Sequence, residues 1–175
     1  MSLSKRKSLA VLLRYFAAVV GFAVLYILAD FAIDLRPAGI QSSYRFNLGK
    51  LDMDQARVLQ QKNLSILVIR RSASTIANLK QGSRNLQDPA SARSNQPVFA
   101  QNALRSKHPE IFVSYALGTD LGCALEALQN QLKEVCGNAR YDFAGRALQV
   151  DRTFQNLVVP DYNFNNDFNT LTIRP

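Results

Sequence analysis

The sequence contains one histidine, His108, and two cysteines, Cys123 and Cys136. Any site that needs two imidazoles therefore cannot be built from a single copy of the chain. No glycine-rich phosphate loop follows a strand-like segment, and Ser106 and Ser114 stand in no recognisable nucleophile motif. His108 falls in a predicted surface turn, where we assign it no catalytic role. We therefore expect no catalytic residue and predict that the protein is not an enzyme.

Acidic residues are also few, since 13 Asp and Glu stand against 21 Lys and Arg and give a net charge of +8. This excess favours an acidic partner such as nucleic acid, anionic lipid or an acidic protein. We expect most basic side chains of the main domain to lie on a solvated surface: Arg70, Arg71, Lys80, Arg84, Arg93, Arg105 and Lys107.

One long hydrophobic run is present, at residues 9–29, and only Arg14 interrupts it. Its length is close to the ~20 residues that span a bilayer, and it exceeds the apolar core of a signal peptide. No small-residue cleavage motif follows the run. We therefore predict a retained transmembrane helix, with a cleaved signal peptide as the alternative.

The basic residues beside this run predict its orientation. Lys5, Arg6 and Lys7 precede it, so the positive-inside rule predicts a cytoplasmic N-terminus. The rest of the chain then lies outside the membrane, where cysteines oxidise and nucleic acid is not an expected partner. In that compartment Cys123 and Cys136 fit a disulfide better than a catalytic thiol pair.

The remaining sequence is mostly strand-like. Residues 63–72 form a nearly continuous apolar run, typical of a strand buried on both faces. Further strands are predicted within residues 44–51 and 110–117, and two short ones in the tail at 154–175, with turns at 160–161 and 165–167. A short helix is predicted at 74–81, and the Pro-, Ser- and Asn-rich segment 85–110 reads as ordered loop.

The segment between the cysteines has a different pattern. Leu125, Leu128, Leu132 and Val135 recur at helical spacing, with polar residues on the other face. This pattern predicts a short amphipathic helix whose leucines serve packing, within an irregular insertion.

Three strings carry a resemblance to a known family: residues 88–123 (DPASARSNQPVFAQNALRSKHPEIFVSYALGTDLGC), 141–148 (YDFAGRAL) and 154–164 (FQNLVVPDYNF). With the N-terminal anchor, they make nearly the whole chain resemble the Rieske iron–sulfur subunit of ubiquinol–cytochrome c reductase, in its proteobacterial form. The resemblance implies an all-β Rieske-type domain with an N-terminal single transmembrane helix. It also implies three parts: a cytoplasmic N-terminus and anchor (1–35), a hinge linker (36–44) and a periplasmic Rieske-like domain (45–175), with a degenerate cluster-binding region at 112–155.

The family binds a two-iron, two-sulfur cluster through the boxes C-T-H-L-G-C and C-P-C-H-G, which here read GTDLGC and EVCGN. Four residues stand where the family has its cluster ligands: Gly118, Asp120, Glu134 and Gly137. Cys123 and Cys136 fall on the positions of the disulfide that joins the boxes. The resemblance thus implies a degenerate member with a structural disulfide and no cluster ligands, and we expect no cofactor and no metal.

Other departures agree with this reading. The proline-rich loop that covers the cluster in the family falls here on residues 152–154. Tyr141, which in the family bonds a ligand sulfur, is expected to make a structural hydrogen bond or to pack in the core. A calcium or magnesium site at Asp120, Glu134 and Asp142 is the alternative to solvated acids, although calcium requires about six or more oxygen ligands. We expect the leucines between the cysteines to fill the space of the cluster.

By this resemblance, the favoured function is a non-redox accessory subunit of a membrane respiratory complex in the bacterial inner membrane. The complex would be a cytochrome bc-type reductase, a terminal oxidase or a supercomplex, so the expected partners are cytochrome-containing subunits and the lipid bilayer. One alternative is an assembly or regulatory factor that mimics the Rieske subunit. Another is an electron-transfer subunit with a reinvented site, which the single histidine disfavours.

Overall fold

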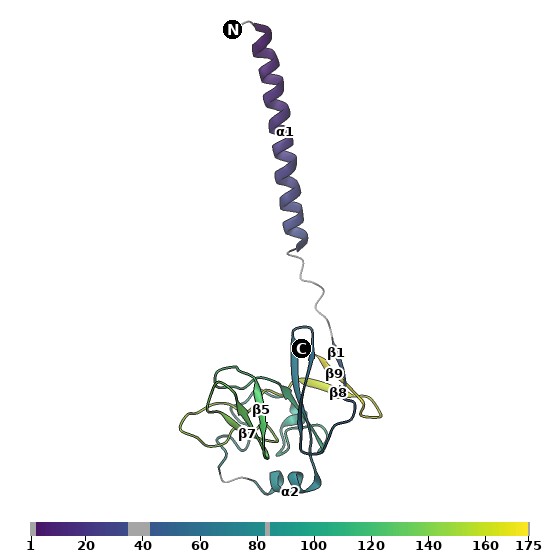
Figure 1. The fold of residues 1–175 in the computed structure, drawn as a ribbon, viewed down its shortest axis with the longest axis vertical. Helices are drawn as coiled ribbons and strands as arrows, with labels where there is room; N and C mark the ends of the chain where they lie inside the picture. Colours follow the sequence, from purple (N-terminus) through teal and green to yellow (C-terminus); the bar gives the residue numbers. More distant parts are fainter. Residues whose placement is uncertain (1–2, 35–42, 83–84, 175) are drawn as a thin grey trace. The chain divides into compact units, whose positions relative to one another are not determined.

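The computed structural model describes residues 3–34, 43–82 and 85–174. The chain divides into two compact units, Met1–Gln41 and Ser42–Pro175. The first contains one helix, α1 (Leu3–Asp34), and the second contains all nine strands of the described chain (Figure 1). The hinge predicted at residues 36–44 lies outside the described residues, except for positions 43 and 44.

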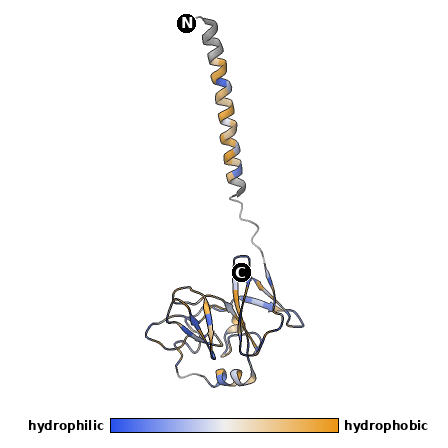
Figure 2. Cartoon of the chain, viewed as in Figure 1, coloured by the Kyte–Doolittle hydropathy of each residue, from blue (hydrophilic) through white to orange (hydrophobic). Residues whose placement is uncertain are grey.

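Helix α1 follows from the long apolar run of the N-terminus. Its segment Ala10–Phe31 has 22 residues and a mean hydropathy of 2.2, which makes it long and apolar enough to cross a membrane (Figure 2). In length and composition the helix therefore agrees with the predicted anchor.

The second unit is built from three antiparallel sheets of three strands each. The first sheet has the order β1-β9-β8, with β1 at Tyr44–Asn47, β9 at Thr170–Arg174 and β8 at Asp161–Phe164. The second has the order β2-β3-β4, with strands at Ala56–Gln61, Leu64–Arg70 and Ile111–Tyr115. The third has the order β5-β6-β7, with strands at Leu125–Leu128, Gln131–Glu134 and Arg140–Asp142. The predicted fold class, all-β with one N-terminal apolar helix, is confirmed.

Strand β3 lies at the centre of the second sheet, and its sequence explains that position. Four consecutive residues, Ile66 to Ile69, are almost fully buried, so the strand is covered on both faces as predicted. The predicted strands that became β1, β4, β8 and β9 are also present. The predicted short helix is α2 (Ala73–Gln81): Ser72 caps it by accepting a hydrogen bond from the Thr75 amide, and Gly82 ends it with φ of +78°.

The helix predicted between the cysteines is wrong, because this segment forms the hairpin of β5 and β6. The turn consists of Gln129 and Asn130, and Asn130 adopts the left-handed φ of +56° that asparagine tolerates. Leu125 and Leu132 face the core, whereas Leu128 and Val135 are exposed, so the helical spacing of the four residues is coincidental. The hairpin is part of a regular sheet, whereas the sequence pattern predicts an irregular insertion here.

The expectation that the basic residues lie mostly on the surface is wrong for Arg71 and Arg105, which are fully buried. Arg71 donates to the carbonyls of Leu104 and Pro109, at 2.8 and 2.9 Å. Arg105 donates to the carbonyls of Gly145 and Leu157, at 2.9 and 2.8 Å. Burial lowers the pKa of each guanidinium to about 10, so both remain charged at neutral pH. The two side chains thus join backbone segments that form no regular strand pairs. Arg84 lies outside the described residues.

Candidate functional site

The two boxes form adjacent loops at one end of the third sheet. The first box loop (residues 118–123) precedes β5, and the second box loop (residues 134–139) connects β6 to β7. The disulfide implied by the resemblance is present: Cys123 pairs with Cys136, with a Cα–Cα distance of 6.0 Å. Within the first box loop, the Gly118 amide donates to the Cys123 carbonyl at 2.8 Å, which closes the loop on itself.

The side chain at the centre of the two loops is Glu134, which is fully buried. Its carboxylate accepts hydrogen bonds from three backbone amides of the first box loop: Cys123 at 2.8 Å, Leu121 at 3.0 Å and Asp120 at 3.3 Å. Hydrogen bonds from backbone amides to a carboxylate are charge-assisted, and such bonds are among the stronger hydrogen bonds in proteins. Glu134 therefore ties the second box loop to the first through these hydrogen bonds.

The structure brings together all four positions that the resemblance assigns to lost ligands. A Cβ atom on Gly118 would lie 2.4 Å from Cδ and 2.5 Å from Oε2 of Glu134, closer than real contacts allow. A Cβ atom on Gly137 would lie 3.2 Å from Oδ2 of Asp120 and 3.6 Å from Oε2 of Glu134. The glycines thus provide the space that the two carboxylates use.

Asp120 connects the first box loop to residues 152–154, the segment where the family has its covering loop. Its Oδ1 lies 3.3 Å from a terminal nitrogen of Arg152, and its side chain is nearly buried, whereas that of Arg152 is 63% exposed. Beside Arg152, Phe154 is buried and packs edge-on against Tyr141, with ring centroids 5.5 Å apart. Residues 152–154 are therefore held by this ion pair, by this aromatic contact and by two hydrogen bonds with Gln87, which donates to the Arg152 carbonyl at 2.8 Å and accepts from the Phe154 amide at 3.1 Å.

Tyr141 makes a structural hydrogen bond and is also a core aromatic, as expected. It is fully buried, and its hydroxyl accepts a hydrogen bond from the Thr119 amide at 2.8 Å. The Thr119 hydroxyl lies 3.0 Å from the same oxygen and donates to the Gln155 carbonyl. Burial raises the pKa of Tyr141, so its hydroxyl stays protonated and can donate to Thr119.

The donor atoms of this region do not fit an iron–sulfur cluster or a calcium ion. Gly118 and Gly137 offer no side-chain donor, and the oxygens of Glu134 already accept three amide hydrogen bonds. Asp142, the third acid of the calcium alternative, instead accepts from Arg146 at 2.8 Å and from two backbone amides. Among the described residues, Cys123, Cys136 and Glu134 do place possible ligand atoms within 4.8 Å of one another. Disulfide sulfurs are not the thiolates that metals bind, however.

The other candidate residues form no reactive arrangement within the described part of the chain. His108 is half-buried and packs against the Phe168 ring at 4.9 Å, and its Nδ1 has no hydrogen-bond partner. Ser106 accepts from Arg71 at 2.6 Å and donates to the His108 carbonyl at 2.8 Å. Ser114 is buried, and its hydroxyl has no partner.

Sequence reasoning missed the role of Glu134, because it assigned the filling of this space to leucines. Leu125 and Leu132 do face the core, but the group between the boxes is the carboxylate. The available signal was the combination of acids at two ligand positions with glycines at the other two.

No family model matches the chain. Among curated proteins, the ubiquinol–cytochrome c reductase iron–sulfur subunit of Allochromatium vinosum is 25% identical to it over 159 aligned residues, which span 84% of this chain and 77% of the relative. Among solved structures, a chain of a hyperthermophilic respiratory Complex III superposes with a TM-score of 0.49 and 17% identity, over 93% of this chain and 98% of that one. At low identity, the chain is thus similar in sequence to the iron–sulfur subunit of a respiratory reductase.

Proposed function

We propose that this protein is a non-redox accessory subunit of a membrane respiratory complex, with a Rieske-like domain that holds no iron–sulfur cluster. The observation that carries the proposal is the buried carboxylate of Glu134, bound by three amides of the first box loop. A carboxylate in this position occupies the space between the boxes, and it accepts the hydrogen bonds that the amides of the first box loop can donate.

Donor chemistry supports the absence of a cluster. A Rieske cluster takes two thiolates and two imidazoles. Its four ligand positions here carry Gly118, Asp120, Glu134 and Gly137, and carboxylates are hard donors that suit magnesium or calcium rather than iron sulfide. The cysteines form a disulfide, and the single histidine packs against Phe168. Without a cluster, the domain has no group to carry an electron, so its role in the complex is structural.

The N-terminal helix supports the location that we propose. The apolar segment Ala10–Phe31 supports a single-pass anchor, and the basic residues before it support a cytoplasmic N-terminus in a bacterial inner membrane. The domain after the anchor is then periplasmic, which agrees with its disulfide. The similarity to a reductase subunit supports cytochrome-containing partners.

The test is purification of the tagged full-length protein from its native membranes in mild detergent. Mass spectrometry identifies the retained proteins and their proportions, and iron, acid-labile sulfide and electron paramagnetic resonance are measured on the same sample. We expect a haem-containing complex in fixed proportion, with iron and labile sulfide no higher than that complex supplies.

Two results would contradict this proposal in different ways. Retention of immature assemblies alone would favour the assembly or regulatory factor. Additional stoichiometric iron and sulfide with a resonance signal, lost in a variant of the box loops, would favour an electron carrier. An untagged strain provides the control for non-specific retention.

A further inference from the structure

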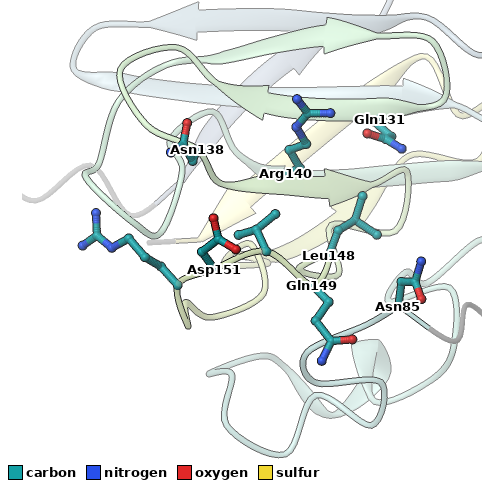
Figure 3. Close-up of a pocket in the computed structure, with 9 residues that line it drawn as sticks. Asn85, Gln131, Asn138, Arg140, Leu148, Gln149 and Asp151 are labelled. Atoms are coloured by element: carbon teal, nitrogen blue, oxygen red, sulfur yellow. The ribbon is translucent and has the colours of Figure 1, made fainter.

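A polar pocket of about 470 Å³ lies between the third sheet and residues 148–152. In the view of Figure 3, Arg140 lies between Asn138 and Gln131, with Asp151 and Leu148 across from them. We propose that this pocket binds a small anionic ligand that carries carboxylate or phosphate oxygens. The proposal concerns the isolated chain and does not depend on the proposed function.

Positive charge gathers at this pocket. Arg140 and Arg152 line it, and Lys133 lies directly opposite Arg140 in the register of β6 and β7. Like charges directly opposite each other in an antiparallel pair are destabilising. Glu126 of β5, which lies opposite Lys133 on the other side of β6, offsets part of this repulsion, and an anion beside Arg140 would offset the rest. One acid, Asp151, also lines the pocket, so basic side chains outnumber acidic ones there.

Hydrogen-bond donors accompany the charge. Across residues 3–34, 43–82 and 85–174, no ion pair or hydrogen bond involves the guanidinium of Arg140, nor the side-chain amides of Gln131, Asn138 and Gln149. A planar guanidinium matches carboxylate and phosphate oxygens, and the neighbouring amides can donate to the same group. The donor set therefore favours an oxyanion over an apolar or cationic ligand.

The pocket is linked to the first box loop through Arg152. This side chain lines the pocket and also pairs with Asp120 at 3.3 Å. An anion in the pocket therefore competes with Asp120 for the same guanidinium. Neutralising Asp120 should strengthen anion binding, an effect that a purely structural ion pair would not produce.

The test is calorimetric titration of the full chain, in phosphate-free dodecyl maltoside, with inorganic phosphate and separately with citrate. We expect saturable binding of one anion per chain for at least one of the two probes. Arg140→Gln should weaken it roughly tenfold, the loss expected for a charge-assisted contact. Asp151→Asn and Asp120→Asn should strengthen binding about two- to fivefold, because each removes a carboxylate that opposes the anion.

The matched control is Arg57→Gln, which makes the same charge change on β2, away from the pocket. Repeating the titration in phosphatidylcholine nanodiscs, with and without phosphatidylglycerol, separates the two sources of the ligand. A weaker apparent affinity with phosphatidylglycerol identifies a lipid headgroup as the occupant, and an unchanged affinity identifies a free anion. No saturable binding of either probe, or equal loss in Arg57→Gln and Arg140→Gln, would overturn the proposal.

Discussion

The sheet β2-β3-β4 and the two box loops belong to the same domain but are stabilised by different interactions. In the sheet, side chains such as Ile66, Val68 and Phe112 are fully buried, and apolar burial stabilises the strands. In the loops, Leu121 and Val135 are 55% and 60% exposed, and the main connections are the Glu134 carboxylate and the disulfide. Loops too exposed to bury apolar surface can thus be joined by a buried charge and a covalent bond.

The largest loss of stability is expected from a substitution in the sheet β2-β3-β4. Phe112→Ala in β4 removes a fully buried ring and should lower the free energy of unfolding by about 3–5 kcal/mol. Equilibrium denaturation of the full chain in detergent, followed by circular dichroism, measures it. Val58→Ala, at a half-exposed position of β2, is the control and should cost less than about 1 kcal/mol. Similar losses for the two variants would contradict burial as the main stabilising term.

Removing the disulfide should cause the second-largest loss of stability. Cys123→Ser with Cys136→Ser opens a loop with a sequence separation of 13 and should cost about 3 kcal/mol on the chain-entropy model. Denaturation with and without reductant checks it, because reductant should destabilise the parent chain and leave the double variant unchanged. A parent chain insensitive to full reduction would show that the loops do not need the covalent bond.

Glu134→Gln tests the carboxylate. It keeps the shape of the side chain, but one oxygen that accepts amide hydrogen bonds can be replaced by a donor group, so we expect a loss of about 1–3 kcal/mol. Amide hydrogen exchange at Leu121 and Cys123 should accelerate, while exchange in β3 should change less. Glu126→Gln, an exposed position on β5, is the matched control.

Gly118→Ala tests whether positions 118 and 134 share one space between the box loops. The added Cβ should destabilise the parent chain, because it meets Glu134, and should cost much less in a Glu134→Ala background. Additive losses would mean that the two positions do not share one space.

The smallest effect is expected from Arg152→Gln, which breaks the ion pair with Asp120. The Arg152 side chain is 63% exposed, and exposed pairs contribute about 0–1 kcal/mol. The difference from the parent chain should shrink in high salt, because screening weakens surface pairs. A large, salt-independent loss would indicate that residues 152–154 support the box loops more strongly than the geometry suggests.

Features encoded locally could be predicted from the sequence, and features that depend on distant contacts could not. The apolar run of β3 and the long apolar run of α1 define these elements by themselves. The β5–β6 hairpin was missed because four apolar residues happen to match a helical period, while the turn at Asn130 decides the structure. Burial of Arg71 and Arg105 depends on backbone carbonyls far along the chain, which no local pattern reveals.

In the candidate site, too, some features could be predicted from the sequence and others could not. The sequence could show which residues occupy the box positions, and the structure brings all four together. That the Glu134 carboxylate lies against Gly118 could not be predicted, because the contact depends on how the two loops close. The pocket beside Arg140 is formed by β6, β7 and residues 148–152 together, so it too required the fold.

The close approach of Gly118 and Glu134 couples the residue types that these two positions can carry. Any side chain at position 118 begins with a Cβ atom, and that atom would meet the carboxylate at 2.4–2.5 Å. A cysteine introduced there would have to displace the Glu134 side chain, which accepts the amide hydrogen bonds of the first box loop. A side chain at position 118 and the present position of the Glu134 carboxylate therefore exclude each other. The two positions thus form one unit, in which a change at either residue alters what the other can accommodate.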